Sequence, residues 1–256
     1  MILVDMNQIA ISHLMVRSKI EDGINIASVR KSIVRVIGRI AKKFGPEYGQ
    51  MVLCYDDKNY WRREIFPFYK KNRKQEREAS KYDWDQVFSV LNIIRDELKG
   101  NFPYKVLQVQ GAEADDIVAS LCMDNSKREA PEKVLILSAD KDFIQLHIYA
   151  NVSQFDPVRK RWIKHSKPVE YLAEHILRGD RGDGVPNVLS KDDCFINGRQ
   201  KPLRKTFIAK VGLSEDPELP SEEVKRNYLR NKQLVDLTQT PEDIQLNILE
   251  QFAKPA

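Results

Sequence analysis

Three carboxylates stand within four residues in the stretch GAEADDIVASL (residues 111–121): Glu113, Asp115 and Asp116. An apolar run with helical spacing follows them. Acidic side chains in the first turn of a helix accept hydrogen bonds from its free N–H groups and oppose the positive end of its dipole. Taken alone, the stretch favours this structural explanation, because acidic first turns are common. A metal-binding cluster is the alternative, and it needs support from other carboxylates of the chain.

Further aspartates stand where predicted strands end. MILV runs into Asp5, MVLCY into Asp56, and KVLILSA into Asp140 and then Asp142. Ligands of open parallel sheets bind beyond the carboxyl ends of the strands, so these side chains are expected to meet those of residues 113–116 at one edge. Carboxylates that close repel one another unless a cation neutralises them. Their oxygens suit Mg²⁺ or Mn²⁺ rather than zinc, so the sequence predicts a metal-binding edge.

The hydrophobic spacing that would position these residues predicts an α/β fold. Strands are expected at residues 1–4, 51–55, 105–109 and 133–137, and a β-hairpin at residues 151–165 around DPVRK. Helices are expected at residues 25–44 (ended by Gly45 and Pro46), at residues 84–99 and from about residue 112. From residue 168 onward the chain is expected to be helical with loops, which places a boundary near residue 167.

The stretch KNYWRREIFPFYKKNRKQER (residues 58–77) is strongly basic, with eight Lys or Arg against two Glu, although the whole chain carries only +5. A block of charge usually marks a solvated face. Here aromatic residues are interleaved with the charges: Tyr60, Trp61, Phe66, Phe68 and Tyr69. Cations for phosphates and rings for unstacked bases suit nucleic acid, although some of these rings must belong to the core.

Composition and motifs disfavour several other classes. The chain is 42% hydrophobic and 31% charged, as soluble globular proteins are, and no apolar run approaches the roughly 18 residues of a membrane span. Its start lacks the basic segment of a secretory signal, and its three cysteines have no CxxC spacing, so a reducing cytoplasm is expected.

Other catalytic patterns fit less well. The four histidines, His13, His147, His165 and His175, lack HExxH spacing and are expected to be ordinary surface or core residues. The sequence has no GxGxxG, P-loop or GxSxG motif, and Asn7 stands where a DxDxT phosphotransferase needs an acid. Metal-dependent phosphodiester hydrolysis is therefore the favoured chemistry.

The series VDMNQ, LCYDD, YWRREIFPFYKKNR, EADD, SADKDF and LRGDRGDGVP, in that order, resembles the 5′-nuclease (flap endonuclease) superfamily over about residues 1–188. Within it the series is most similar to the ribonuclease H branch of T-even-type phages, whose members are 5′-to-3′ exonucleases, and RNKQLVDL resembles a late motif of that branch. The resemblance implies a central, mostly parallel sheet flanked by helices (a PIN-like core), a helical arch and two metal sites.

The resemblance also implies roles for residues that match the family's motifs. Its metal-binding positions fall on Asp5, Asp56, Glu113, Asp115, Asp116, Asp140, Asp142, Asp180 and Asp183. The catalytic cations of the arch fall on Lys70 and Arg73, its stacking aromatic on Tyr69 and an earlier nucleic-acid-binding arginine on Arg62. Arg77, at the end of the basic block, is expected to bind nucleic acid without acting on the reacting phosphate.

The expected organisation is a nuclease core at residues 1–167, with the arch segment at about residues 58–80, and a helical C-terminal region at residues 168–256. That region would hold the loop of the second metal and elements that contact duplex DNA. Gly184 replaces the family's Asn after the GDxxD motif, and no GIG turn follows it. Lys201, Arg204 and Lys205 remain as candidates for phosphate contacts.

The expected function is a metal-dependent 5′-to-3′ exonuclease and flap endonuclease that uses two Mg²⁺ ions, which Mn²⁺ can replace. Its substrates would be RNA–DNA hybrids and branched or duplex DNA, and its task the removal of lagging-strand RNA primers in phage-type replication. Replication proteins such as a single-strand-binding protein or a sliding clamp would be partners. A non-catalytic nucleic-acid-binding module of the same fold and a PIN-type ribonuclease are the alternatives, but gathered carboxylates repel phosphate, and a PIN domain lacks the arch.

Overall fold

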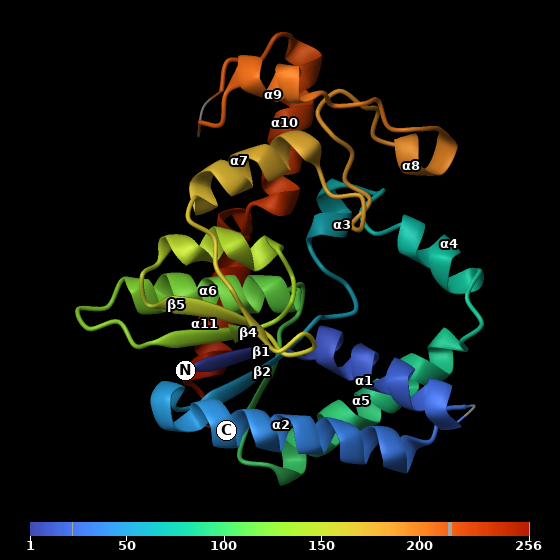
Figure 1. Cartoon of the computed structure of the whole chain (residues 1–256), viewed down its shortest axis with the longest axis vertical. Coiled ribbons are helices and arrows are strands. Elements are labelled where there is room, and N and C mark those ends of the chain that lie inside the picture. The colour runs from blue at the N-terminus through green and yellow to red at the C-terminus, as the bar shows by residue number, and fades with distance from the viewer. Residues whose placement is uncertain (22, 215–216, 256) are drawn as a thin grey trace.

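A six-stranded sheet forms the centre of the molecule in the computed structural model, which describes residues 1–21, 23–214 and 217–255 (Figure 1). The strand order is β3-β2-β1-β4-β5-β6, and all pairs are parallel except the β5–β6 hairpin. The strands are β1 (Ile2–Asp5), β2 (Met51–Tyr55), β3 (Lys105–Gln108), β4 (Val134–Leu137), β5 (Val152–Asp156) and β6 (Arg161–Ile163). The predicted fold class and hairpin are confirmed.

Helices cover both faces of the sheet, which explains why its central strands are continuously apolar. One face packs against α1 (Met6–Glu21), α2 (Ile26–Tyr48) and α5 (Trp84–Asn101). The other packs against α6 (Ala114–Ser126), η1 (Asp142–Ile148), η2 (Leu237–Gln239) and α11 (Glu242–Ala253). Alternate residues of a strand serve the two layers: Leu3 faces the α6 side, whereas Ile2 and Val4 face the α2 side.

A smaller group of helices stands beyond the α6 face, at the top of Figure 1. It contains α7 (Pro168–Arg178), α8 (Cys194–Asn197), α9 (Lys205–Val211) and α10 (Glu222–Val235), and α7, α9 and α10 share an apolar cluster. The arch segment (residues 58–80) runs between β2 and α5 and holds α3 (Arg62–Ile65) and α4 (Asn72–Glu78). Among the described residues, no helix is long and apolar enough to span a membrane.

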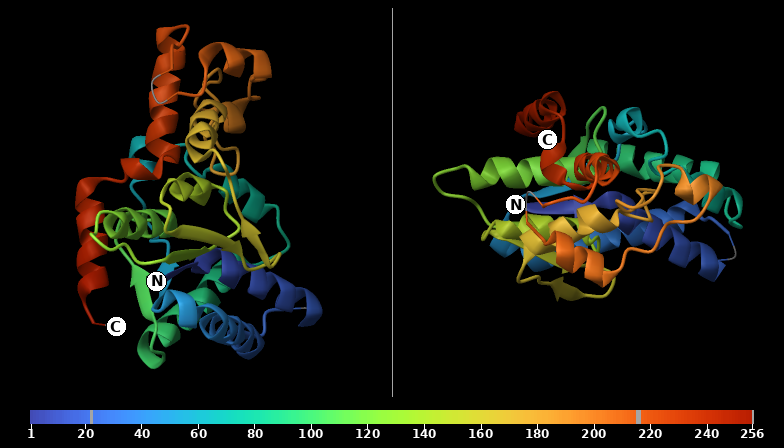
Figure 2. Two further views of the ribbon diagram at one scale, coloured as in Figure 1. Left: turned by 60° about the vertical axis from the view of Figure 1, so that its left-hand side comes forward. Right: turned by 90° about the horizontal axis from the view of Figure 1, so that it is seen from above.

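The chain returns to the core after α10. Helix α11 packs against α6 and crosses it (Figure 2), and Leu237, Ile244 and Ile248 are buried in the same cluster as Leu3 and Ile117. The boundary expected near residue 167 coincides with the start of α7, but the end of the region beyond it belongs to the core.

The helix expected at residues 25–44 continues through Gly45 and Pro46 and ends at Tyr48. A proline lacks one N–H, so within the last turn it removes a single helical hydrogen bond. Gly49 ends the helix instead, at φ 77°, and its N–H donates to the Gly45 carbonyl at 2.8 Å. The end predicted at Gly45–Pro46 is therefore wrong.

Helix α1 was not predicted, although it follows the first strand directly. Its apolar residues lie on both sides of the helix: Ile9 and Leu14 are buried, whereas Val16 is exposed. This arrangement weakens the amphipathic pattern on which helix prediction depends.

Truncating a core residue of α11 tests whether this helix stabilises the sheet. Ile248→Ala removes a fully buried side chain and should lower the free energy of unfolding by about 2–5 kcal/mol. Leu246→Ala, on the exposed side of the same helix, should change it by no more than about 0.5 kcal/mol. Urea unfolding followed by circular dichroism measures both, and equal effects of the two changes would contradict the assignment of α11 to the core.

Candidate active site

Four aspartates, which we call the strand-end cluster, gather at the carboxyl edge of the sheet: Asp5, Asp56, Asp115 and Asp140. Asp5 ends β1, Asp56 follows β2 and Asp140 follows β4, and these three strands are neighbours in the sheet. Asp115 joins them from the first turn of α6, which is held at this edge because the Ala114 N–H donates to Asp56 Oδ1 at 2.7 Å. The structure thus brings together carboxylates that are up to 135 positions apart in the chain.

Local hydrogen bonds fix the orientation of Asp5. Its Oδ1 accepts from the Gln8 N–H at 3.1 Å and its Oδ2 from the Ser138 hydroxyl at 2.9 Å. The same hydroxyl accepts from the Asp140 N–H at 3.0 Å, so Ser138 connects the ends of β1 and β4. These side chains are therefore placed by the backbone at the strand ends and not by chance contacts.

Burial and the neighbouring charges raise the pKa of three members of the cluster, Asp5, Asp115 and Asp140. Burial raises the pKa of the Asp5 carboxyl to about 7, and the charges of Asp56 and Asp140 add to the rise. Burial raises the pKa of Asp115 well above its ordinary value, and the charges of Asp140 and Asp5 add to the rise. Such carboxylates are forced together by the fold, and a bound divalent cation would relieve the repulsion. The donor set, carboxylate oxygens in a partly buried site, fits a hard divalent metal.

A second set of carboxylates, which we call the loop group, lies beside the first: Asp142, Asp180 and Asp183. Burial and the neighbouring Asp140 raise the pKa of Asp142 well above its ordinary value, and Asp183 and Asp180 contribute, after burial, to the raised pKa of Asp140. The loop after α7 is closed on itself, because Asp180 Oδ1 accepts from the Asp183 N–H at 3.0 Å.

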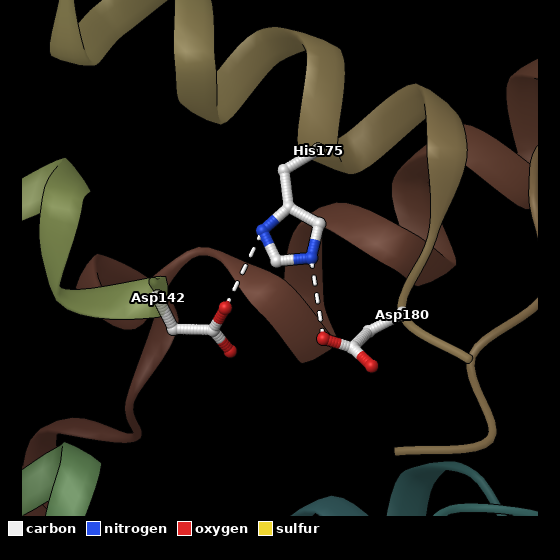
Figure 3. Close-up of side chains that lie close together, drawn as sticks. All are labelled: Asp142, His175 and Asp180. Carbon is white, nitrogen blue, oxygen red and sulfur yellow. Dashed lines mark ion pairs between the residues drawn. The ribbon is translucent and has the colours of Figure 1, made fainter. Parts of the chain in front are cut away.

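His175 stands between two members of the loop group, as Figure 3 shows. Its Nδ1 lies 3.5 Å from Asp142 Oδ1 and its Nε2 lies 3.4 Å from Asp180 Oδ2. These three residues offer ligand atoms within 4.8 Å of one another. We expected His175 to be an ordinary surface or core histidine, so its position between two carboxylates was not predicted. The sequence signal was its place one helical turn before the GDxxD motif.

Asp116 and Arg62 form a buried unit instead of facing a ligand. The two oxygens of Asp116 accept hydrogen bonds from Trp61 Nε1, Arg62 Nη1, the Glu113 N–H and Thr240 Oγ1, at 3.2, 2.9, 2.8 and 2.8 Å. A carboxylate offers about four lone pairs, so these donors saturate it. The prediction of Asp116 as a metal ligand does not fit this geometry, and we propose that it anchors Arg62.

The expected roles of Arg62 and Tyr69 at the nucleic acid do not fit either. Arg62 is 1% exposed and Tyr69 is 4% exposed. The Tyr69 hydroxyl lies within hydrogen-bond distance of two carboxylate oxygens, Glu113 Oε2 at 3.0 Å and Asp183 Oδ2 at 2.8 Å. Tyr60 and Phe66, two other rings of the arch segment, are also core residues. They are buried in one cluster with Val185 and with Leu234 and Val235 of α10. Interleaved aromatics in this block therefore supply a core and not a stacking surface.

The cations of the arch segment face the carboxylates. Lys70 Nζ is paired with Glu113 and lies 3.5 Å from Asp183 Oδ2. Arg73 is also paired with Asp183, and its Nε donates to the Gly182 carbonyl at 3.1 Å. Lys70 and Arg73 thus lie at the edge of the two groups of carboxylates.

Glu113 and Arg77 have different surroundings from the other expected metal ligands and nucleic-acid-binding residues. Glu113 is 1% exposed and paired with Arg62 and Lys70, so its charge is compensated within the protein. Arg77 lies at the far end of α4 with its guanidinium carbon 5.5 Å from the Phe88 ring centre.

Comparison with known proteins identifies the family. The model of the 5′-3′ exonuclease N-terminal, resolvase-like domain matches residues 1–175. The chain belongs to the 5′-3′ exonuclease family, a class of 5′ nucleases. It is 36% identical over 265 residues to the protein named Ribonuclease H of Enterobacteria phage T4, covering 98% of this chain and 85% of that protein. The resemblance inferred from the motifs is confirmed.

More distant relatives share part of the chain. The protein named Flap endonuclease Xni of Shewanella sp. (strain MR-4) is 28% identical over 140 residues, covering 52% of this chain and 49% of that protein. The chain thus matches about half the length of that relative. The fold is that of the T5 5′-exonuclease, solved with bound divalent metal ions (zinc), at a TM-score of 0.70 and 20% identity over 98% of both chains.

Removing the buried guanidinium tests its structural role. Arg62→Gln leaves Asp116 buried without its cation and Glu113 with Lys70 alone, and should lower the free energy of unfolding by about 3–5 kcal/mol. Arg63→Gln, the exposed neighbour, should change it by no more than about 0.5 kcal/mol. Chemical unfolding without metal measures both, and a stable Arg62→Gln protein that binds nucleic acid poorly would instead favour a binding role for Arg62.

Proposed function

We propose that the chain is a divalent-metal-dependent 5′-to-3′ exonuclease and flap endonuclease. The observation that carries the proposal is the crowding of Asp5, Asp115, Asp140 and Asp142, whose pKa values are all raised, at the carboxyl edge of the sheet. A surface that only binds nucleic acid gains nothing from carboxylates, because they repel phosphate. An edge built to hold cations explains them.

The two groups of carboxylates suit two divalent ions, and Mg²⁺, with Mn²⁺ as a substitute, is the ion that the oxygen ligands favour. The strand-end cluster would hold one ion and the loop group the other, with Glu113 at their border. When bound, such ions activate a water and stabilise the leaving oxygen during attack on phosphorus. The protein's own contribution is to fix these ligands on strand ends and helix starts, where the backbone holds them in place.

The arch segment supplies cations to the reacting phosphate. Lys70 and Arg73 lie against Glu113 and Asp183, so they need only exchange a carboxylate for a phosphate to contact a substrate at this edge. Positive charge placed there stabilises the negative charge that grows during phosphoryl transfer. No histidine or serine nucleophile is required for such a reaction.

The substrate is proposed from the relatives' names together with the arch. RNA–DNA hybrids and branched or duplex DNA are the proposed substrates, since one relative is named Ribonuclease H and another Flap endonuclease. Removal of lagging-strand RNA primers, with a single-strand-binding protein or a sliding clamp as partner, is the corresponding task. The three cysteines are buried and unpaired, which suits the reducing cytoplasm.

Cleavage by a ligand variant tests the proposal. Asp140→Asn keeps the shape of the site but removes a ligand charge, so turnover with Mg²⁺ should fall at least ~100-fold, or about 2.7 kcal/mol of lost transition-state stabilisation. Binding to flap DNA in Ca²⁺ should stay within a few-fold, since one repulsive charge is gone. Single-turnover cleavage of a 5′-labelled flap and of an RNA–DNA hybrid measures the rates, and chelator should abolish cleavage.

Asp57→Asn is the matched control. The Asp57 carboxylate accepts from the Gly111 N–H at 3.1 Å, which an amide oxygen can also do, and turnover should change little. A wild-type rate in Asp140→Asn would refute the site. Wild-type protein that binds flap DNA but cleaves neither substrate would favour the nucleic-acid-binding module.

The arch cations provide a separate prediction. Lys70→Ala and Arg73→Ala should slow single-turnover cleavage far more than they weaken binding, because their charges act on the reacting phosphate. Arg77→Ala, which removes a cation outside the carboxylate groups, should mainly weaken binding and reduce its dependence on salt. Binding isotherms at several salt concentrations beside cleavage rates distinguish the two effects. If all three variants only weaken binding, the arch segment serves to hold the substrate.

A further inference from the structure

The side chain of His175 differs from the other histidines in what it faces. His13 Nδ1 lies 2.8 Å from the Ser32 hydroxyl, His147 Nε2 lies 3.0 Å from the Gln154 amide oxygen, and His165 Nδ1 accepts from the Lys167 N–H at 3.2 Å. These partners are neutral and within ordinary hydrogen-bond distance. Both nitrogens of His175 face carboxylates instead, at 3.4 and 3.5 Å, which is longer than a typical N–H···O bond.

The backbone builds this arrangement. Helix α7 ends one turn after His175, where the Gly179 N–H donates to the His175 carbonyl at 2.8 Å. Gly179 has φ +65°, and a Cβ there would lie 2.4 Å from the Val185 carbonyl oxygen, so the turn requires glycine. The chain folds back immediately, and the Val185 N–H donates to the Asp180 carbonyl at 2.7 Å. Asp180 is therefore fixed beneath the imidazole (Figure 3).

The third member comes from a different element. Asp142 is the first residue of η1, which packs against α7, and its N–H donates to Asp140 Oδ1 at 3.0 Å. The Tyr171 ring, one turn before His175 on α7, meets the imidazole edge-on at 5.9 Å between ring centres. The imidazole thus contacts an aromatic ring and has a carboxylate near each of its two nitrogens. The side chain of His175 is 13% exposed.

The chemistry of this donor set differs from that of the strand-end cluster. Four carboxylates suit Mg²⁺, Mn²⁺ or Ca²⁺, whereas an imidazole nitrogen beside carboxylates suits zinc-like transition metals. One ligand atom from each of Asp142, His175 and Asp180 already lies within 4.8 Å of the others, so small side-chain movements would bring all three around one ion. Three protein ligands with the remaining positions open are typical of metal sites that also contact a substrate.

We propose that His175 is a ligand of the second metal site, which is thereby a mixed Asp142–His175–Asp180 site with a preference for Zn²⁺ or Co²⁺ over Mg²⁺. The proposal deepens the proposed function, since it concerns the ion that the loop group would hold. The strand-end cluster remains an all-oxygen site, so the two sites differ in the metals that they select.

Nitrogen NMR of the free protein tests the ligand directly. The chain has four histidines, and protein labelled with ¹⁵N only in histidine gives a spectrum in which each imidazole can be followed. One equivalent of Zn²⁺, without nucleic acid, should shift a ring nitrogen of one histidine strongly, whereas Mg²⁺ should not. That signal should be absent in His175→Gln and unchanged in His165→Gln, the matched control, whose imidazole contacts the Tyr171 ring and pairs with no carboxylate of the described residues.

Metal affinity gives the second measurement. In competition with a chromophoric chelator, His175→Gln should bind Zn²⁺ more weakly by at least about 10- to 100-fold, the loss found when a residue that only orients a metal ligand is replaced. Its Mg²⁺ affinity should change by less than about 3-fold, and His165→Gln should match the wild type for both ions. Circular dichroism of each variant establishes that it is folded, and the wild-type spectra need no variant at all.

The outcomes separate this proposal from the proposed function. A wild-type protein that cleaves flap DNA with Mg²⁺ while Zn²⁺ shifts no nitrogen of His175 overturns the ligand proposal and leaves the nuclease in place. A protein whose His175 nitrogen shifts with Zn²⁺ but which cleaves no substrate supports the mixed site and refutes the nuclease. Equal losses of Mg²⁺ and Zn²⁺ affinity in His175→Gln would also contradict the preference proposed for this site.

Discussion

A single buried guanidinium joins the parts of the molecule that make the candidate active site. Arg62 Nη1 donates to Glu113 and to Asp116 at 2.9 Å, and its Nε donates to the Leu234 carbonyl at 2.9 Å. One side chain thus connects the arch segment to the start of α6 and to α10. Removing a charge from water costs several kcal/mol unless partners replace the solvent, so this arrangement is stable only while all three parts are in place. The start of α6, which carries Asp115, is thereby fixed.

Residues 113–116 contain carboxylates in two different electrostatic environments. Glu113 and Asp116 have cations against them, and their negative charge is used inside the protein to hold the arch segment. Asp115, between them in sequence, faces Asp140 and Asp5 and shares their raised pKa. Helical geometry explains the difference, because neighbouring residues point about 100° apart around the axis. Both explanations considered for residues 113–116 therefore apply: Glu113 and Asp116 form a capping box, while Asp115 faces the cluster.

The sequence predicted the features that depend on local pattern and parallel-sheet geometry. The ends of β1, β2 and β4 could be recognised from apolar runs, and parallel strands deliver their carboxyl ends to one edge, so the meeting of Asp5, Asp56 and Asp140 followed. The burial of Arg62 could not be predicted, because its partner Leu234 is 172 positions away. A basic, aromatic-rich composition describes a solvated surface and a charged core equally well. The position of His175 between two carboxylates depends on the turn at Gly179, and the sequence signal for it was its place one helical turn before the GDxxD motif.

The glycine that departs from the family's pattern follows from how closely the arch segment approaches the loop group. Gly184 has φ +71°, and a Cβ there would lie 2.9 Å from the Phe68 carbonyl oxygen. An asparagine would push these two segments apart, since a real Cβ contact is never so short. The Lys70 N–H, at a positive φ of 55°, donates to the Asp183 carbonyl at 2.7 Å across the same approach. The backbones are thus joined independently of the side chains, so the exchange of a carboxylate for a phosphate that we propose for Lys70 would leave the base of the arch in place.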